Sequence, residues 1–426
     1  MTVALNYHSG FRNFRLAWAR AFRECRPLGA SGILSIPWVT QSIIHLARGD
    51  HAHLISNASR LLKINPTGVG LFYLAHSQFL NGRYDECLSS LNAFLAGNPH
   101  HPDGCYLLAQ VFTCEAYQDR NDRALAWRTL EELAKHSRRP KTWLVMANLV
   151  QNSDDFQRLH TAWLSAKKAG LTPAFNADIN NYLSIGALRA GEYGIARQIW
   201  RDTIAQMESA PSPPKKAKKH SSAFTPRHGA VALRDVTRAL SRHDIQSFLV
   251  SGTLLGCIRE GQLLGHDKDI DIGVWEDAPR HKLLKAVATC GKFYIQPSRA
   301  PETIRLKHVN GTAIDVFYHY REDNKIWHGG VKARWYNSRF SLTERKFLGG
   351  RYLIPKDYER YLVENYGQDW RVPKPVFDCV YDTPNAVIIN DDEMAVHDYR
   401  ILMQSIENSN RDRCQSHAGE LVSQTK

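Results

Sequence analysis

Apolar residues between positions 41 and 207 recur at helical spacing, and the arrangement repeats along the chain. Two consecutive copies share a glycine, two apolar positions and a proline at the same spacing: Gly49, Ala58, Leu61 and Pro66, then Gly82, Leu91, Phe94 and Pro99. A glycine that ends one helix and a proline that follows the next are typical of stacked helix pairs. One pair cannot bury its apolar face alone, so each pair must pack against its neighbours. The pattern therefore predicts an all-α N-terminal half.

This repeated pattern resembles the tetratricopeptide (TPR) family, and a further copy includes Leu183, Gly191 and Trp200. We therefore predict TPR-like helical repeats over residues 41–207. The resemblance implies either a groove that binds a protein partner or a polymer, or a scaffold that packs against the second half. Residues 1–40 form a separate predicted helical segment in which arginines alternate with aromatic residues. This segment either caps the array or lies on a membrane surface.

Prolines and like charges mark the boundary between the two halves. Pro211, Pro213 and Pro214 precede the basic run Lys215-Lys216-Ala217-Lys218-Lys219. Proline removes helix donors and neighbouring lysines repel one another, so we predict an extended linker over 208–228. A catalytic domain is predicted over 229–400, and a polar tail over 401–426.

Apolar spacing changes after the linker. A helix is predicted over 230–240 and a short buried strand over 248–250, which stops at Ser251-Gly252-Thr253. A helix that opens from such a corner presents free backbone N–H groups and a hydroxyl, which suit phosphate oxygens. Further strands are predicted over 269–274 and 312–317, and an amphipathic helix over 358–366. Helices mixed with strands in this way predict an α+β second half.

The strand predicted over 269–274 alternates acidic with apolar residues. Asp269 and Asp271 therefore project from the same face. Adjacent carboxylates repel each other unless a cation bridges them, and hard oxygen ligands on a rigid strand suit Mg²⁺ or Mn²⁺. Asp267 lies just before the strand, in reach of the same ion or a second one. The alternative is an acidic turn that leads into an ordinary edge strand.

A single carboxylate, Asp315, interrupts the apolar run predicted as the strand 312–317. A carboxylate in such a run is costly unless it binds a metal, pairs with a cation or is held protonated. We predict that it is a further metal ligand or the general base for the attacking hydroxyl. Pairing with Arg305 on a neighbouring strand is the structural alternative.

Several motifs in the second half occur in a recognisable order: Ser251-Gly252-Thr253-Leu254-Leu255-Gly256, Arg259, Gly261, Asp267, Asp269-Ile270-Asp271-Ile272-Gly273, Ile314-Asp315-Val316-Phe317, Phe347-Leu348-Gly349, Glu364-Asn365-Tyr366-Gly367 and Asp369-Trp370. Together they resemble the LicD/fukutin family over about residues 248–373. The resemblance implies a nucleotidyltransferase fold with a mixed sheet. Gly265-His266 stands where the family has Pro-Trp, and Lys268 where another acid is common, so specificity is expected to differ there.

The resemblance also implies an activity: a metal-dependent phosphotransferase that moves phosphocholine, or a phospho-alditol such as ribitol phosphate. The donor would be linked to cytidine diphosphate (CDP), and the acceptor would be a glycan hydroxyl in surface-polysaccharide biosynthesis. The predicted metal ligands are Asp267, Asp269, Asp271 and Asp315, of which the last three are the predicted catalytic residues. The predicted substrate-binding residues are Ser251, Gly252, Thr253, Arg259, Arg305 and Lys307.

Two other functions remain open. One is a nucleotidyltransferase that acts on a protein, a sugar or RNA with the same metal core. The other is a TPR binding protein whose transferase domain is inactive, although an inactive site has no need to keep repulsive carboxylates together.

Composition narrows the class of protein without adding a site. A hydrophobic content of 43% is typical of globular chains, and the eight scattered cysteines include no Cys-x-x-Cys pair, which fits a reducing cytoplasm. The net charge of +13 suits nucleic acid, anionic lipid or phosphorylated substrates, and among these nucleic acid is not expected as a partner. No apolar run is long enough to span a bilayer, and no secretory signal pattern is present. We predict a cytoplasmic protein with peripheral membrane association.

Overall fold

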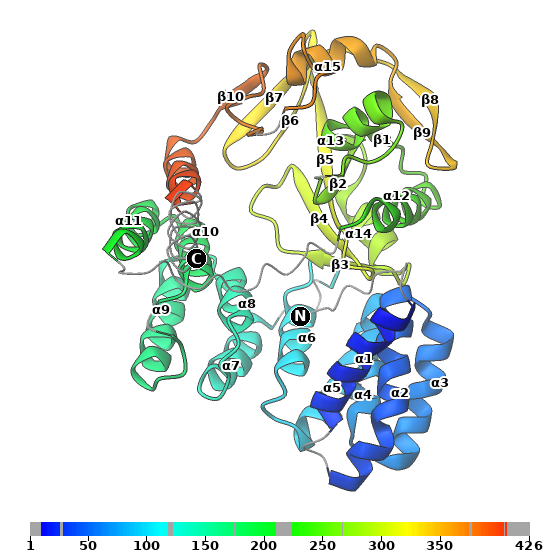
Figure 1. Cartoon of the computed structure of the whole chain (residues 1–426), viewed down its shortest axis with the longest axis vertical. Coiled ribbons are helices and arrows are strands. Elements are labelled where there is room, and N and C mark those ends of the chain that lie inside the picture. The colour runs from blue at the N-terminus through cyan, green and yellow to red at the C-terminus, as the bar shows by residue number, and fades with distance from the viewer. Residues whose placement is uncertain are drawn as a thin grey trace, which may run out of the picture. The chain divides into compact units, whose positions relative to one another are not determined.

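The computed structural model describes residues 10–25, 29–117, 122–173, 175–209, 224–265, 267–374, 377–403 and 405–406 (Figure 1). The chain divides into two compact units, one of Met1–Ala126 with Ser221–Val387 and one of Trp127–His220 with Ile388–Lys426. Most of the predicted linker, including its lysine run, lies outside the described residues, as do His266 and residues 407–426.

The first unit begins with a series of helices in which each packs against the next. Figure 1 shows α1 to α5 side by side. Gly49 and Gly82 have φ values of 63° and 70° in the turns after α2 and α4, a conformation that glycine adopts without strain. The helices are α1 (Gly10–Cys25), α2 (Gly29–Arg48), α3 (His51–Ile64), α4 (Val69–Leu80), α5 (Tyr84–Gly97) and α6 (Pro102–Phe112). The N-terminal half is therefore helical as predicted, while its relation to TPR repeats stays a prediction.

These helices contact the C-terminal half directly. His51 Nε2 lies 2.7 Å from the Gly291 carbonyl oxygen, and the Gly291 N–H donates to the Leu80 carbonyl at 2.9 Å. The half-buried Tyr294 ring stacks on Phe79 at a centroid distance of 6.0 Å. The first helices thus pack against the C-terminal half, and their role as a scaffold stays a prediction.

The second unit is also helical within the described residues. Gly191, predicted to end a first helix, has a φ of 77° between α10 and α11. Residues 391–403 are helical and contact α11 through Arg197–Asp392 at 2.7 Å and through Arg201 Nε, which donates to the Tyr399 hydroxyl at 2.9 Å. Its helices are α8 (Lys141–Leu149), α9 (Ser153–Lys168), α10 (Ala177–Arg189) and α11 (Tyr193–Ser209), and α7 (Arg123–Ala134) starts at the end of the first unit.

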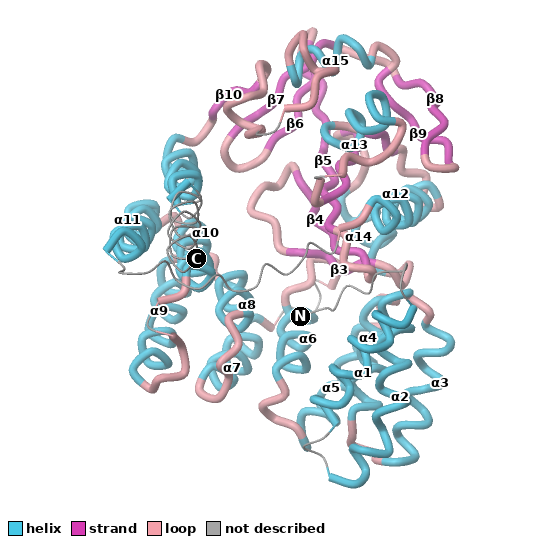
Figure 2. The backbone as a smooth tube through the Cα atoms, in the orientation of Figure 1, coloured by secondary structure: helices cyan, strands magenta, loops and turns pink. Residues whose placement is uncertain are grey.

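The C-terminal half is built on a mixed sheet of ten strands within the described residues, shown in magenta in Figure 2. The strand order is β10-β7-β6-β5-β2-β1-β9-β8, and β4 pairs with both β3 and β5. The strands are β1 (Ser247–Leu249), β2 (Asp269–Trp275), β3 (Phe293–Gln296), β4 (Thr303–His308), β5 (Ala313–Glu322), β6 (Lys325–Gly329), β7 (Ala333–Ser338), β8 (Leu342–Phe347), β9 (Gly350–Pro355) and β10 (Ala386–Ile388). The predicted fold class, a helical first half and an α+β second half, is confirmed.

The helices of this half follow local sequence signals. α12 (Pro226–Ser241) begins four residues before its predicted start, because the Thr225 hydroxyl accepts the His228 N–H and Pro226 suits the first turn. α13 (Ser251–Leu255) opens from the predicted corner and continues as a π-helix over Gly256–Glu260. α14 covers Arg280–Ala288. α15 (Tyr358–Tyr366) has the predicted bounds, since Asp357 caps its start.

Candidate active site

Two neighbouring strands bring three of the predicted acids to one face of the sheet. β2 and β5 are parallel, with Asp271 opposite Asp315 and Asp269 opposite Ala313. Residues opposite each other in a ladder project to the same side, so the three carboxylates share a face. Ile270 and Ile272 point to the other side and are fully buried in the core. The alternation in the sequence thus holds the acids in place through the burial of the residues between them.

The end of β1 lies against this acidic face. Ser251 has a φ of 47°, which costs a non-glycine residue about 1–2 kcal/mol. After this bend the Gly252 N–H donates to Asp271 Oδ2 at 3.2 Å. A Cβ atom on Gly252 would lie 2.9 Å from Asp267 Oδ2 and 3.4 Å from Asp271 Oδ2. Both carboxylates therefore border Gly252, and only a residue without a side chain fits between them.

The acids raise one another's pKa. Burial, followed by the charge of Asp269, raises the pKa of Asp267 to about 7. Burial is the largest cause that raises the pKa of Asp269, and it raises the pKa of Asp271 well above its usual value. The charges of neighbouring carboxylates add to the effect in both. Burial also raises the pKa of Asp315, against the lowering effect of Arg305. Carboxylates in this state bind a cation at the expense of their protons.

The residues fit a divalent metal ion. Asp267 Oδ2 is buried and has no hydrogen-bond partner among the described residues. The donor set consists of carboxylate oxygens, the ligands that Mg²⁺ and Mn²⁺ prefer. The orphaned oxygen and the raised pKa values both indicate that positive charge is needed at this face.

Two predicted cationic residues lie on the same face. On β4, Arg305 lies opposite Asp315 of β5, and Lys307 lies opposite Ala313 of β5. Arg305 Nε approaches Asp315 Oδ1 at 3.4 Å, the pairing named above as the structural alternative. The Arg305 side chain remains 56% exposed, so the same guanidinium is accessible to a ligand. Burial lowers the pKa of Lys307.

Two other predicted substrate-binding residues are engaged elsewhere. Thr253 is fully buried, and its hydroxyl oxygen accepts the Asp271 N–H at 2.9 Å. The largely buried Arg259 guanidinium pairs with Glu260 at 3.1 Å and donates to the Trp370 carbonyl at 3.3 Å. Contacts of both residues with substrate stay predictions, and these partners favour structural roles.

Two tyrosines lie near the acids, and no role in the site was predicted for them. Tyr361 and Tyr366 are part of α15, the helix predicted as amphipathic over 358–366. Burial raises the pKa of each hydroxyl, and the charge of Asp271 adds to that effect in both. α15 therefore lies close to the acidic face. Motifs of the family resemblance, including Glu364-Asn365-Tyr366-Gly367, indicated that this helix belongs to the same domain.

An aromatic cluster continues the acidic face along β2. The Phe248 ring contacts Trp275 at a centroid distance of 4.8 Å and His319 at 5.0 Å. His319 is fully buried, and its Nδ1 lies 3.1 Å from the Phe317 carbonyl oxygen. The His328 ring stacks on His319 at 4.7 Å. This packing requires a neutral imidazole.

The buried imidazole predicts a loss of stability in acid. Burial lowers the pKa of His319 from 6.5 to about 4. The unfolded chain therefore takes up this proton first, so the stabilisation is complete above pH 6.5 and is lost as the pH falls through about 4. It amounts to at most about 3 kcal/mol. Urea unfolding between pH 7 and pH 4 is expected to show a weaker pH dependence for His319→Phe than for the original chain. Equal slopes for the two chains would contradict this assignment.

The sheet and the acidic face define a nucleotidyltransferase-type domain. Residues 244–357 match the model of the LicD/FKTN/FKRP nucleotidyltransferase domain, and this segment of the chain is a domain of that family. The predicted family resemblance is thereby confirmed.

Curated relatives share the same region at low identity. The chain is 24% identical over 166 residues to human ribitol-5-phosphate transferase FKTN, covering 36% of this chain and 35% of the relative. The mouse protein of the same name is 25% identical, and the match again covers 36% of this chain and 35% of the relative. An uncharacterized protein of Rickettsia prowazekii is 26% identical over 104 residues, 24% of this chain and 37% of that protein. The chain spans about a third of the length of these relatives.

Helices that could cross a bilayer are not found in the described part of the chain, where each is too short or too polar.

Proposed function

We propose that the chain is a phosphotransferase that moves phosphocholine, or a phospho-alditol such as ribitol phosphate, from a CDP-linked donor to a glycan hydroxyl. The proposed pathway is the biosynthesis of a surface polysaccharide. The observation that carries the proposal is the pairing of Asp271 with Asp315 on adjacent parallel strands, beside the Gly252 turn. The family of the domain and the name of the human relative, a ribitol-5-phosphate transferase, support the same reaction class.

In the proposed reaction, the acceptor hydroxyl oxygen attacks the phosphorus atom of the transferred group. A new P–O bond forms, the bond to cytidine monophosphate (CMP) breaks, and CMP leaves. Asp315, on the same face as Asp271, would act either as a further metal ligand or as the general base that takes the hydroxyl proton. Arg305 and Lys307, on the same face, would offset the negative charge of the donor phosphates.

Asp267, Asp269, Asp271 and Asp315 are the proposed ligands of Mg²⁺ or Mn²⁺. Two such ions, when bound, would stabilise the attacking oxygen and the leaving phosphate in an in-line displacement. The Gly252 N–H holds Asp271 Oδ2 in place at 3.2 Å, and Ser251 supplies the bend that directs this N–H.

Donor preference tests the proposal. The full chain with Mg²⁺ would be titrated calorimetrically with CDP-ribitol, CDP-glycerol and CDP-choline, and with CTP and ATP for comparison. Binding of one CDP conjugate, with CMP release when a glycan acceptor is added, is expected. Pyrophosphate release from CTP or ATP without binding of any CDP conjugate would instead identify a nucleotidyltransferase that acts on a protein, a sugar or RNA.

We also propose that the helical N-terminal half holds a glycan or a protein partner near the catalytic domain. The proposal concerns surfaces not used by the contacts of α3 and α4 with Gly291 and Tyr294. Nucleic acid is not proposed as a partner.

A membrane surface is proposed as the cellular setting, at the inner face of the cytoplasmic membrane. Helix α1 buries its small residues, Ala17, Ala21 and Cys25, and exposes large ones. The exposed fractions are 44% for Phe14, 42% for Leu16 and 41% for Trp18, with Arg15 and Arg23 also exposed. Aromatic residues beside arginines suit the interface of an anionic bilayer.

Vesicle binding is expected to depend on this helix. The chain should sediment with vesicles that contain phosphatidylglycerol and less with phosphatidylcholine vesicles. Replacing Phe14 and Trp18 together by serine should weaken binding about 10-fold or more, since burying each aromatic side chain contributes about 1.5–3 kcal/mol. Leu164→Ser, at another exposed apolar residue, is the control and should bind normally. The proposal would be refuted if the chain bound both kinds of vesicle equally, or if the double variant bound phosphatidylglycerol vesicles as well as the original chain.

A further inference from the structure

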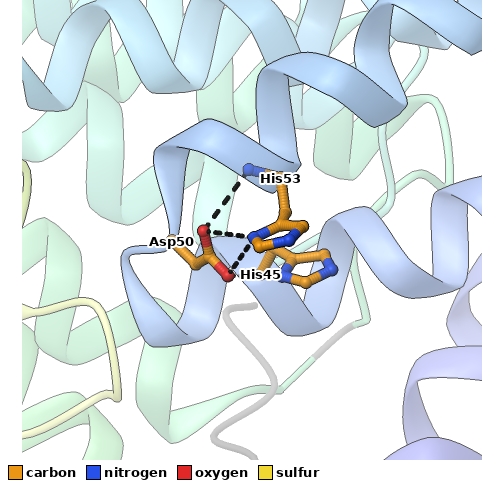
Figure 3. A group of neighbouring side chains, drawn as sticks. All are labelled: His45, Asp50 and His53. Carbon is orange, nitrogen blue, oxygen red and sulfur yellow. Dashed lines mark hydrogen bonds and ion pairs between the residues drawn. The ribbon is translucent and has the colours of Figure 1, made fainter.

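The turn between α2 and α3 gathers two histidines and one aspartate (Figure 3). His45 is in the last turn of α2, Asp50 is the N-cap of α3, and His53 is in the first turn of α3. Gly49, with a φ of 63°, makes the turn tight enough to bring the three side chains together. Their spacing in the sequence matches no familiar metal-binding motif.

The potential ligand atoms of these side chains converge. His45 Nδ1 lies 3.0 Å from Asp50 Oδ2, and His53 Nδ1 lies 2.9 Å from the same oxygen. The two imidazole rings are nearly parallel, with centroids 5.0 Å apart. One ligand atom from each residue fits within a mutual separation of 4.8 Å. His45 and Asp50 are half-buried, whereas His53 is 71% exposed, which leaves an entry path from solvent.

Hydrogen bonds from two imidazoles to one carboxylate account for these separations on their own, but the same three side chains could also bind a metal ion. Two imidazole nitrogens and one carboxylate oxygen are the protein ligands of many zinc and other transition-metal sites. Bonds of about 2.0–2.2 Å in a tetrahedron place ligand atoms about 3.4 Å apart. The present N···O separations therefore need to open by only about 0.4 Å. Because the His53 side chain is exposed, water would be the fourth ligand.

The same turn docks on the catalytic half. Lys292 Nζ donates to the Arg48 carbonyl at 2.8 Å and approaches the Gly49 carbonyl at 3.4 Å. His51, between the proposed ligands Asp50 and His53, reaches the Gly291 carbonyl oxygen at 2.7 Å. A metal ion held by residues on both sides of this turn would fix the backbone that these contacts use.

We propose that His45, Asp50 and His53 form a structural site for a transition-metal ion such as Zn²⁺, which stabilises the junction between the N-terminal helices and the catalytic half. The site is separate in residues and in chemistry from the acidic face, because imidazole nitrogen prefers Zn²⁺ or Co²⁺ whereas carboxylates alone suit Mg²⁺. The proposal therefore does not depend on the proposed transferase activity.

Metal titration of the full chain tests this site. Chelator-treated protein, with excess Mg²⁺ present to occupy the acidic face, would be titrated calorimetrically with Zn²⁺ and followed by visible absorption with Co²⁺. His53→Ala removes an exposed ligand, and Asp50→Asn removes the carboxylate while keeping an N-cap oxygen for α3. Each change is expected to weaken Zn²⁺ binding at one site at least 10-fold, since even the loss of an outer-shell partner costs about 10–100-fold.

His281→Ala, at an exposed histidine of α14, is the matched control and should keep both stoichiometry and affinity. Zn²⁺ should also raise the melting temperature of the original chain and of the control, but not that of His53→Ala. If His53→Ala and Asp50→Asn bind as much Zn²⁺ as tightly as the control, the cluster is only a hydrogen-bonded helix cap and the proposal is wrong. Because no transfer assay is involved, this result leaves the proposed function untouched.

Discussion

Asp271→Asn is expected to reduce group transfer about 1,000-fold or more without unfolding the chain. Asparagine has nearly the same shape, and its side-chain oxygen can still accept the Gly252 N–H that now donates to Asp271 Oδ2. The lost negative charge removes a proposed metal ligand, and metal stabilisation of transferred charge contributes several kcal/mol, where about 1.4 kcal/mol corresponds to tenfold in rate. Initial rates of CMP release, measured over a range of Mg²⁺ concentrations, would detect the change.

The same substitution should stabilise the metal-free chain. Burial and neighbouring carboxylates raise the pKa of Asp271, so its charged form is unfavourable in the fold. A higher melting temperature together with lost activity would separate a site effect from misfolding. Asp277→Asn, at a residue whose side chain is 76% exposed, is the control and should alter neither property. Full activity of Asp271→Asn would exclude the proposed metal role.

Gly273→Ala is expected to destabilise the first unit by about 1–3 kcal/mol, the usual range for overpacking a core. A Cβ atom at this position would lie 2.4 Å from Phe248 Cε2 and 2.8 Å from His319 Cε1. Gly273 is on the same strand face as Asp271, where β1 and β5 bring these two rings over it. Urea unfolding followed by tryptophan fluorescence would measure the loss.

The sign of this effect is diagnostic, since replacing glycine by alanine at an unstrained site usually stabilises a protein by about 0.4–1 kcal/mol. Gly330→Ala, in the turn after β6, has no heavy atom within 4 Å of the added Cβ and should be neutral or slightly stabilising. Adding Phe248→Leu to Gly273→Ala should recover part of the loss by making room. Unchanged stability in Gly273→Ala would mean that the Phe248 ring moves aside freely.

The acidic strand could be predicted from the sequence because its signal is local. Alternation of Asp269 and Asp271 with buried isoleucines fixes which side chains share a face, whatever the neighbouring strands do. The corner at Gly252 was predicted for the same reason. The register that places Asp271 opposite Asp315 is a non-local property. The cost of a carboxylate in an apolar run and the family resemblance indicated a shared site, but neither gave the register.

The predicted substrate-binding residues differ in whether packing leaves their side chains available to a ligand. Thr253 and Arg259 have side chains that suit phosphate, yet packing directs the first to the Asp271 N–H and the second to Glu260 and Trp370. Arg305 has an equally suitable side chain and remains exposed on the acidic face. Residue type alone cannot distinguish these cases, since the partners come from distant parts of the chain.

No sequence pattern predicts the contacts between the N-terminal helices and the C-terminal half. Many of its hydrogen bonds use backbone groups, such as the Leu80 and Gly291 carbonyls, and every residue carries such groups. The prolines and lysines near residue 215 mark a change of composition, but Met1–Ala126 and Ser221–Val387 share one compact unit across it.

This discontinuous unit has a consequence for synthesis on the ribosome. His51 must wait for Gly291, which is 240 residues further along the chain. At about 5–20 residues per second, the faces of α3 and α4 that receive Gly291 and Tyr294 stay without these partners for on the order of 10–50 s. Slower translation between the two regions lengthens that exposure, so codon usage in the intervening stretch should influence how much of the nascent chain aggregates before it is complete.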